Sequence, residues 1–299
     1  MNLAAVDIGS NAVRLLLCNV VKSNGGHAIK KSELLRVPLR LGNDSFSKGH
    51  LTPTTISKLH DTLTAFKLLM KVNEVVDYRI CATSALRDAT NNKEIVKKIK
   101  KDVGLQIEII DGKTEAKTIV SNRIAESMDH RKSYLYIDVG GGSTELTLFS
   151  KNKPVASKSL NIGTLRILYE TDTKEEWEKL DQWLNKHCSK LNSLTAIGSG
   201  GNINKIYKMS RLKSGELLSV RKLKEMHNHL KELTLSERIQ IFGLKPDRAD
   251  VIVPASKIFL TITNKTGIKQ IFVPQFGLSD GIVHELYEKN KKKYKALIK

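Results

Sequence analysis

The sequence predicts an α/β protein made of two related domains, and three observations support this. First, apolar strand-like runs alternate with amphipathic helical segments along the 299 residues. Second, hydrophobic residues make up 40% of the chain, enough for a sizeable core. Third, residues 134–149, YLYIDVGGGSTELTLF, resemble residues 3–18, LAAVDIGSNAVRLLLC. Each segment is typical of a strand, a glycine turn and a strand, so an internal repeat with a cleft between two domains is expected. Chance agreement of two common hairpins is the alternative.

The elements of the first half follow in chain order. After the first hairpin, residues 51–73 predict a helix with Thr52 as its N-cap and Pro53 in its first position. One face of that helix is apolar and carries Ile56, Leu59, Leu63, Phe66 and Met70. A strand ending in a polar loop, a helix, a strand and a helix are then expected at residues 77–91, 92–104, 105–111 and 112–128.

The second half repeats the opening hairpin and continues with helices and strands. The patterns predict a helix at 174–191, and a strand, glycine loop and helix at 194–209. They predict further helical segments at 219–242 and 246–263, a strand at 269–274 and a C-terminal helix. A polar segment near residue 128 is the expected boundary, which gives domains 1–128 and 129–299.

The charge and composition restrict the function without identifying it. Lysine and arginine number 50 against 31 acidic residues, so the net charge is +19, which favours polyanionic ligands such as nucleic acid, phosphate chains or anionic lipid. Part of the charge lies in the tail at 288–299, where a solvated helix end is the plainer interpretation. The N-terminus lacks a signal-peptide pattern, no apolar run reaches membrane-spanning length, and the three cysteines form no metal or disulfide pattern. We therefore expect a cytoplasmic protein that is not associated with a membrane.

The glycine turns of the two hairpins are candidate phosphate sites. Backbone N–H groups in such a turn can converge on an anion. The pattern leaves open whether Ser10 corresponds to Gly141 or, with a shift, to Ser143. The predicted substrate-binding residues are Ser10 and Asn11 in the first turn and Gly140, Gly141, Gly142 and Ser143 in the second.

Carboxylates stand beside both turns. Asp138 and Glu145 flank the second turn, and Asp7 precedes the first. Carboxylates would repel a phosphate unless a cation lay between them, and Mg²⁺ commonly shares oxygen ligands with substrate phosphates. Ordinary glycine-rich hairpins with solvated carboxylates are the alternative.

Two further side chains and one loop are weaker candidates. Arg87 follows a strand together with Thr83 and Ser84 and could bind a phosphate oxygen, although an ion pair with Asp88 would also explain it. Glu115 lies in a first helical turn, where the helix dipole alone favours an acid. The GSGGNI loop at 198–203 departs from the dinucleotide-binding pattern and could be a close strand–helix turn.

The ordered set of motifs resembles the Ppx/GppA phosphatases, which are exopolyphosphatases and guanosine pentaphosphate phosphohydrolases. The motifs are AVDIGSNAVRL, ATSALRDATN, IEIIDGKTEAK, YIDVGGGSTEL, SLNIGTLRI, AIGSGGNINKI, DRADVIVPA and FGLSDGI, and they extend over nearly the whole chain. The resemblance implies two ribonuclease-H-like domains of the actin, Hsp70 and sugar-kinase superfamily. It also implies a homodimer.

The resemblance assigns roles to the candidate residues. Glu115 matches the catalytic base, and Arg87 matches a phosphate-contacting arginine. Asp138 and Glu145 match the acidic residues associated with Mg²⁺, and we place Asp7 with them. The sequence departs from the family pattern at Lys117, at the PAS of residues 254–256 and at GLSDG of residues 277–281.

These roles imply hydrolysis of the terminal phosphate of inorganic polyphosphate by a water that Glu115 activates. The same chemistry would serve guanosine pentaphosphate, so that substrate is the principal alternative. A kinase or ATPase of the wider superfamily and a non-catalytic sensor of polyanions or nucleotides are the others. No specific nucleic-acid partner is expected.

Overall fold

The computed structural model describes residues 1–23, 26–120, 129, 131–151, 153–191 and 193–295, and these form two compact units. The strands of the first unit are β1 (Asn2–Ile8), β2 (Val13–Ser23), β3 (Gly26–Val37), β4 (Val75–Ala82) and β5 (Ile107–Ile109). Its helices are α1 (Leu41–Lys48), α2 (Pro53–Val72), α3 (Ser84–Asp88), α4 (Asn92–Asp102), α5 (Gly112–Val120) and α13 (Leu278–Lys295).

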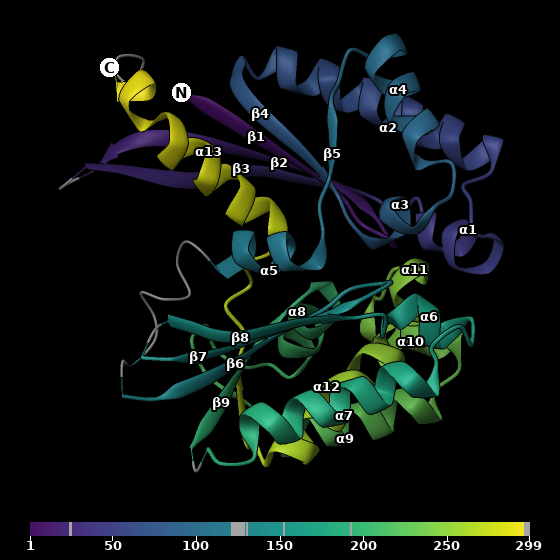
Figure 1. Ribbon diagram of the computed structural model, residues 1–299, viewed down its shortest axis with the longest axis vertical. Helices are drawn as coiled ribbons and strands as arrows, with labels where there is room; N and C mark the ends of the chain where they lie inside the picture. Colours follow the sequence, from purple (N-terminus) through teal and green to yellow (C-terminus); the bar gives the residue numbers. More distant parts are fainter. Residues whose placement is uncertain (24–25, 121–128, 130, 152, 192, 296–299) are drawn as a thin grey trace. The chain divides into compact units, whose positions relative to one another are not determined.

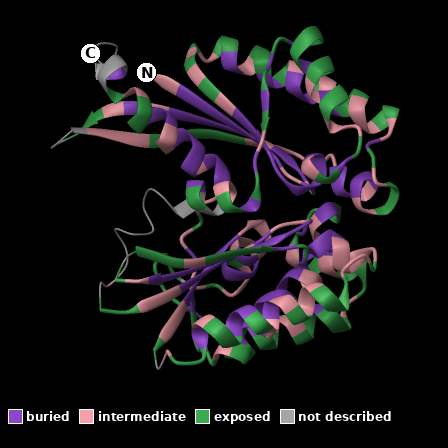
Figure 2. Cartoon of the chain, viewed as in Figure 1, coloured by how far each residue is buried: buried purple, intermediate pink, exposed green. Residues whose placement is uncertain are grey.

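The first unit is a mixed sheet with helices on both faces (Figure 1). The strand order is β3-β2-β1-β4-β5, with β1, β2 and β3 antiparallel and β4 and β5 parallel to β1. Residues of α2 and α4 pack on one face of the sheet, and α13 packs on β1, β2 and β4. Because both faces are covered, the central strand β1 is an almost continuous apolar run and is buried (Figure 2).

The second unit repeats this arrangement. Its strands are β6 (Ser133–Val139), β7 (Thr144–Ser150), β8 (Lys153–Leu160), β9 (Leu194–Ser199), β10 (Leu218–Ser219) and β11 (Gln270–Phe272). Its helices are α6 (Thr164–Leu168), α7 (Lys174–Cys188), α8 (Gly201–Met209), α9 (Val220–Glu232), α10 (Leu235–Phe242), α11 (Pro246–Ala249) and α12 (Ile252–Thr266). The strand order, read from β8, is β8-β7-β6-β9-β11-β10.

The two strand orders agree strand for strand until β10 adds to the second sheet. Each sheet starts with an antiparallel three-strand meander and continues with parallel strands reached through helices. This agreement confirms the predicted α/β fold of two related, ribonuclease-H-like units. Thr52 also caps α2 as predicted, because its side chain accepts a hydrogen bond from the Thr55 N–H.

The C-terminal helix belongs to the first unit, whereas the predicted division assigned residues 129–299 to the second domain. Ile282, Val283 and Leu286 of α13 are buried, which explains why the helix returns to that sheet. The predicted boundary near residue 128 lies outside the described residues. Within the described ranges, every helix is too short or too polar to cross a bilayer.

Candidate active site

The first glycine turn joins β1 to β2 and has Ser10 and Asn11 at its tip. The Gly9 N–H donates to the Ala12 carbonyl at 3.1 Å, which closes the turn. The hydroxyls of Ser10 and Ser84 are hydrogen-bonded at 2.8 Å, and the N–H of Thr83 donates to the Ile8 carbonyl at 3.1 Å. Thr83 and Ser84, which were predicted to lie in a loop, form the start of α3 directly beside the first turn.

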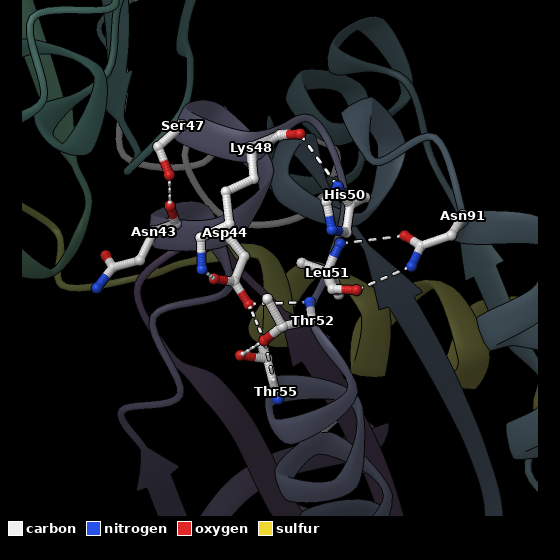
Figure 3. Close-up of polar contacts among 9 residues, drawn as sticks. All are labelled: Asn43, Asp44, Ser47, Lys48, His50, Leu51, Thr52, Thr55 and Asn91. Atoms are coloured by element: carbon white, nitrogen blue, oxygen red, sulfur yellow. Dashed lines mark hydrogen bonds and ion pairs between the residues drawn. The ribbon is translucent and has the colours of Figure 1, made fainter.

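Helix α1 holds the same turn from another side. The Gly42 N–H donates to the Ser10 carbonyl at 2.9 Å, and the Arg40 N–H donates to the Asn11 carbonyl at 3.1 Å. Asp44 fixes α1 to the start of α2, since its carboxylate accepts hydrogen bonds from the Thr52 N–H and hydroxyl (Figure 3). Burial alone would raise the pKa of Asp44, but the hydrogen bonds from Thr52, Thr55 and Lys48 outweigh it and lower the pKa below its ordinary value.

A row of facing residues crosses the first sheet next to the turn. The register places Cys81, Asp7, Arg14 and Arg36 opposite one another on β4, β1, β2 and β3. Arg14 Nη1 lies 2.5 Å from Asp7 Oδ2, and the Asp7 side chain is only 8% exposed. The row therefore carries two guanidinium groups against one carboxylate. Asp7, predicted as a metal ligand, is engaged here by a cation of the protein.

The second glycine turn has the same geometry as the first. The Gly140 N–H donates to the Ser143 carbonyl at 2.9 Å, between strands paired at Val139 and Thr144. The equivalent pair in the first hairpin is Ile8 and Val13. The hairpins thus superpose without a shift, so Ser10 corresponds to Gly141 and not to Ser143.

The carbonyl groups of the second turn are all occupied by the segment that opens α6. The N–H groups of Thr164 and Leu165 donate to the carbonyls of Gly140 and Gly141, at 3.0 and 2.8 Å. Arg166 Nε donates to the Gly142 carbonyl at 2.8 Å. With these carbonyls held on one side, the N–H groups of Gly141 and Gly142 have no acceptor among the described residues and could bind an anion.

Close packing explains a glycine outside the turn. A Cβ atom on Gly163 would lie 2.4 Å from the Gly141 carbonyl oxygen, so only glycine lets this segment approach the turn. Gly163 and Arg166 were not among the predicted site residues. Both residues lie in the NIGTLRI segment, which the sequence analysis noted only as a family motif. The fold places this segment next to the second turn.

A second row of facing residues crosses the second sheet, and its charge is opposite. The register aligns Ser199, Asp138, Glu145 and Ser159 on β9, β6, β7 and β8. Ser159 Oγ donates to Glu145 Oε1 at 3.1 Å, and the Tyr136 hydroxyl donates to Asp138 Oδ2 at 3.4 Å. Two carboxylates directly opposite each other repel, and Glu145 is only 1% exposed, so a cation would stabilise the pair.

The acidic pair fits Mg²⁺. This ion prefers oxygen ligands and is commonly held by one or two carboxylates together with substrate phosphates. Among the described residues no group of three or more His, Cys, Asp or Glu side chains is arranged to hold a metal. Asp138 and Glu145 could supply two acidic ligands of such an ion, and substrate phosphate oxygens would have to complete its coordination.

The glycine loop after β9 lies beside Asp138. Gly200 has φ of +108°, and a Cβ there would lie 2.8 Å from the Val139 carbonyl oxygen and 3.2 Å from Asp138 Oδ1. Arg248 Nη1 donates to the Gly201 carbonyl at 2.9 Å. The GSGG segment, weak evidence in the sequence, thus contributes to the surroundings of the acidic pair.

Glu115 and Arg87 both meet the start of α5. Asp111 caps this helix, since its Oδ1 accepts from the Thr114 N–H at 2.7 Å and its carbonyl accepts from the Glu115 N–H at 2.9 Å. Arg87 Nη1 donates to the Ile110 carbonyl at 3.0 Å, and Arg87 Nε lies 3.5 Å from Asp88 Oδ1. The expected ion pair with Asp88 is therefore present, together with a link to the helix that carries Glu115.

Comparison with known proteins shows to which family the chain belongs. The model of the Ppx/GppA phosphatase family matches residues 20–290. Exopolyphosphatase 2 of Mycobacterium tuberculosis is 26% identical over 95% of this chain and 98% of its own length. Exopolyphosphatase 1 of Mycobacterium leprae is 23% identical, with 95% and 88% covered. The crystal structure of the Aquifex aeolicus Ppx/GppA family member has 27% identity and a TM-score of 0.76, and covers 97% of this chain and 99% of that one.

The family match includes α5 with Glu115 and the whole second hairpin with its acidic pair. The shared fold covers both units. This protein therefore belongs to the Ppx/GppA phosphatase family and is a hydrolase.

Proposed function

We propose that this chain is a Mg²⁺-dependent exopolyphosphatase that releases the terminal phosphate of inorganic polyphosphate. The observation that carries the proposal is the contrast between two equivalent hairpins. The facing pair Asp7 and Arg14 is neutral and is followed by Arg36, whereas Asp138 and Glu145 are both acidic. The second hairpin thus combines turn amides that suit a phosphate with an acidic pair that suits the accompanying cation, whereas the first hairpin carries cationic side chains that favour a phosphate.

Each group has a defined task in this mechanism. The amides of Gly141 and Gly142 bind oxygens of the terminal phosphate, and Arg87 neutralises charge that develops during transfer. Asp138 and Glu145 hold Mg²⁺, which when bound offsets negative charge on the phosphates. Glu115 accepts a proton from the water that attacks the terminal phosphorus in line.

The names of the relatives support polyphosphate as the substrate, because the two Mycobacterium proteins above are exopolyphosphatases. The high positive charge of the chain also favours a long polyanion. Guanosine pentaphosphate ends in the same anhydride, so the chemistry applies to it equally, and the experiment must separate the two substrates.

The test is phosphate release with Mg²⁺ from long-chain polyphosphate, guanosine pentaphosphate and ATP, each measured side by side. Glu115→Gln is expected to lower kcat roughly a hundredfold or more, as loss of a general base does. Glu94→Gln is the matched control, because Glu94 also lies in a first helical turn but is exposed on α4. Preference for guanosine pentaphosphate would reassign the substrate, and no release from any of the three by folded protein would refute the hydrolase mechanism.

A further inference from the structure

Helices α5 and α13 of the first unit pack against each other (Figure 1), and Gly281 lies at their contact. A Cβ atom on Gly281 would lie 2.1 Å from the Thr118 carbonyl oxygen and 2.7 Å from its carbonyl carbon. These distances are far inside van der Waals contact, and the clashing atoms belong to the backbone, so no side-chain rotation can relieve them. The approach of the two helices is possible only because residue 281 is glycine.

Helix α13 is the fixed partner in this contact. Lys31 Nζ lies 2.6 Å from Asp280 Oδ1, and Arg79 Nη1 donates to Glu285 Oε2 at 2.7 Å. Near its end, the buried Tyr294 donates its hydroxyl to Asp77 at 2.6 Å. Polar contacts at three positions along α13, together with its buried apolar face, oppose translation or rotation of this helix.

Helix α5 is the partner that would move. The structure describes its residues Gly112–Val120, and Thr118, 2% exposed, is the residue that contacts Gly281. Glu115 lies three residues before Thr118, about 4.5 Å away along the helix axis. Because residues one helical turn apart are joined by the hydrogen bonds of the helix, a shift imposed at Thr118 would also displace the Glu115 carboxylate.

We propose that Gly281 is a positioning residue for the reaction: by letting α5 rest on α13, it sets the place from which Glu115 takes its proton. This role depends on the proposed function of Glu115. It also gives a physical reason for a glycine at the end of the GLSDG segment, which sequence reasoning treated only as part of a motif.

The test compares two glycine-to-alanine variants four residues apart. Gly281→Ala introduces the clash, whereas Gly277→Ala is the matched control, because a Cβ there meets nothing within 4 Å. For Gly281→Ala we expect kcat for polyphosphate to fall roughly a hundredfold with KM little changed, since a displacement of about 1 Å can have that effect. Amide hydrogen exchange of residues 111–120 should become faster, and Gly277→Ala should match the wild type in both measurements.

The kinetic and exchange readouts separate the possible failures. Wild-type kcat in Gly281→Ala, unchanged exchange in residues 111–120, or an equal loss in Gly277→Ala would each overturn the role of Gly281. Wild-type kcat in Glu115→Gln would instead overturn the proposed function, while exchange would still report whether Gly281 holds α5. If Gly281→Ala does not fold, Glu285→Gln replaces it, and an unchanged kcat when the Arg79 contact is weakened would count against the proposal.

Discussion

Asp44→Asn is expected to destabilise the first unit, because this carboxylate joins α1 to the start of α2 (Figure 3). The Asp44 side chain is 11% exposed and accepts hydrogen bonds from the Thr52 N–H at 3.0 Å and the Thr52 hydroxyl at 2.6 Å. Lys48 Nζ adds a third contact at 2.9 Å. Asparagine keeps one acceptor oxygen and the approximate shape but loses the negative charge.

The magnitude follows from the two contacts to Thr52. A hydrogen bond to a charged group contributes about 1.5–3 kcal/mol and a neutral one about 0.5–1.5 kcal/mol, so each contact should lose about 1 kcal/mol. The Lys48 side chain is 51% exposed, and its ion pair adds little. The expected loss is about 2 kcal/mol, which corresponds to roughly 4–8 °C in Tm for a unit of this size.

The pH dependence gives a second, independent signature. The pKa of Asp44 is lowered in the folded protein, so its stabilisation is complete above the unfolded pKa of about 3.9. It is lost as the pH falls through the lower folded pKa. The stability difference between wild type and Asp44→Asn should therefore be constant from about pH 5 to 7 and shrink below about pH 4.

Urea unfolding followed by tryptophan fluorescence and circular dichroism measures the loss of stability and shows whether it occurs in the first unit. The two tryptophans of the chain, Trp177 and Trp183, lie in the second unit, whereas far-ultraviolet circular dichroism reports on both. Asp44→Asn should shift the circular dichroism transition most. Asp102→Asn is the control, because Asp102 is exposed and its ion pair is with Lys98 on its own helix. An equal shift in both variants, or none in Asp44→Asn, would show that the Asp44 carboxylate does not stabilise the first unit.

Two further predictions concern the hairpins. Arg14→Gln would leave the buried Asp7 carboxylate without its cation and should cost about 3 kcal/mol in urea unfolding at pH 7, whereas Asp7→Asn with Arg14→Gln should cost less. A double variant as unstable as the single would contradict the ion-pair explanation. Gly163→Ala would press a Cβ against the Gly141 carbonyl and should raise KM for polyphosphate about tenfold or more in steady-state assays. An unchanged KM would show that the second turn does not bind substrate.

The accuracy of sequence reasoning depended on the kind of element. The central hairpins and α2 carry strong apolar patterns and caps, and they were predicted well. The edge strands β3 and β8 were missed because their residues are mostly exposed, polar or charged and show no apolar alternation. The helical segment at 219–242 divides into α9 and α10, where Thr234 forms a capping box with Glu237 that interrupts a continuous amphipathic pattern.

Local sequence patterns were sufficient to predict the chemistry of the individual segments of this protein. Glycine turns, the carboxylates beside them and the acid in the first turn of α5 are set by residues close together in the chain, and they carry the family resemblance. Which charges face each other depends on strand register, and that became visible only in the folded chain. Strand register pairs Asp7 with Arg14 but Asp138 with Glu145. The C-terminal helix packs on the first unit, and this brings Gly281 against Thr118. Such contacts depend on packing between distant segments, because spacing along the chain defines neighbours only within an element.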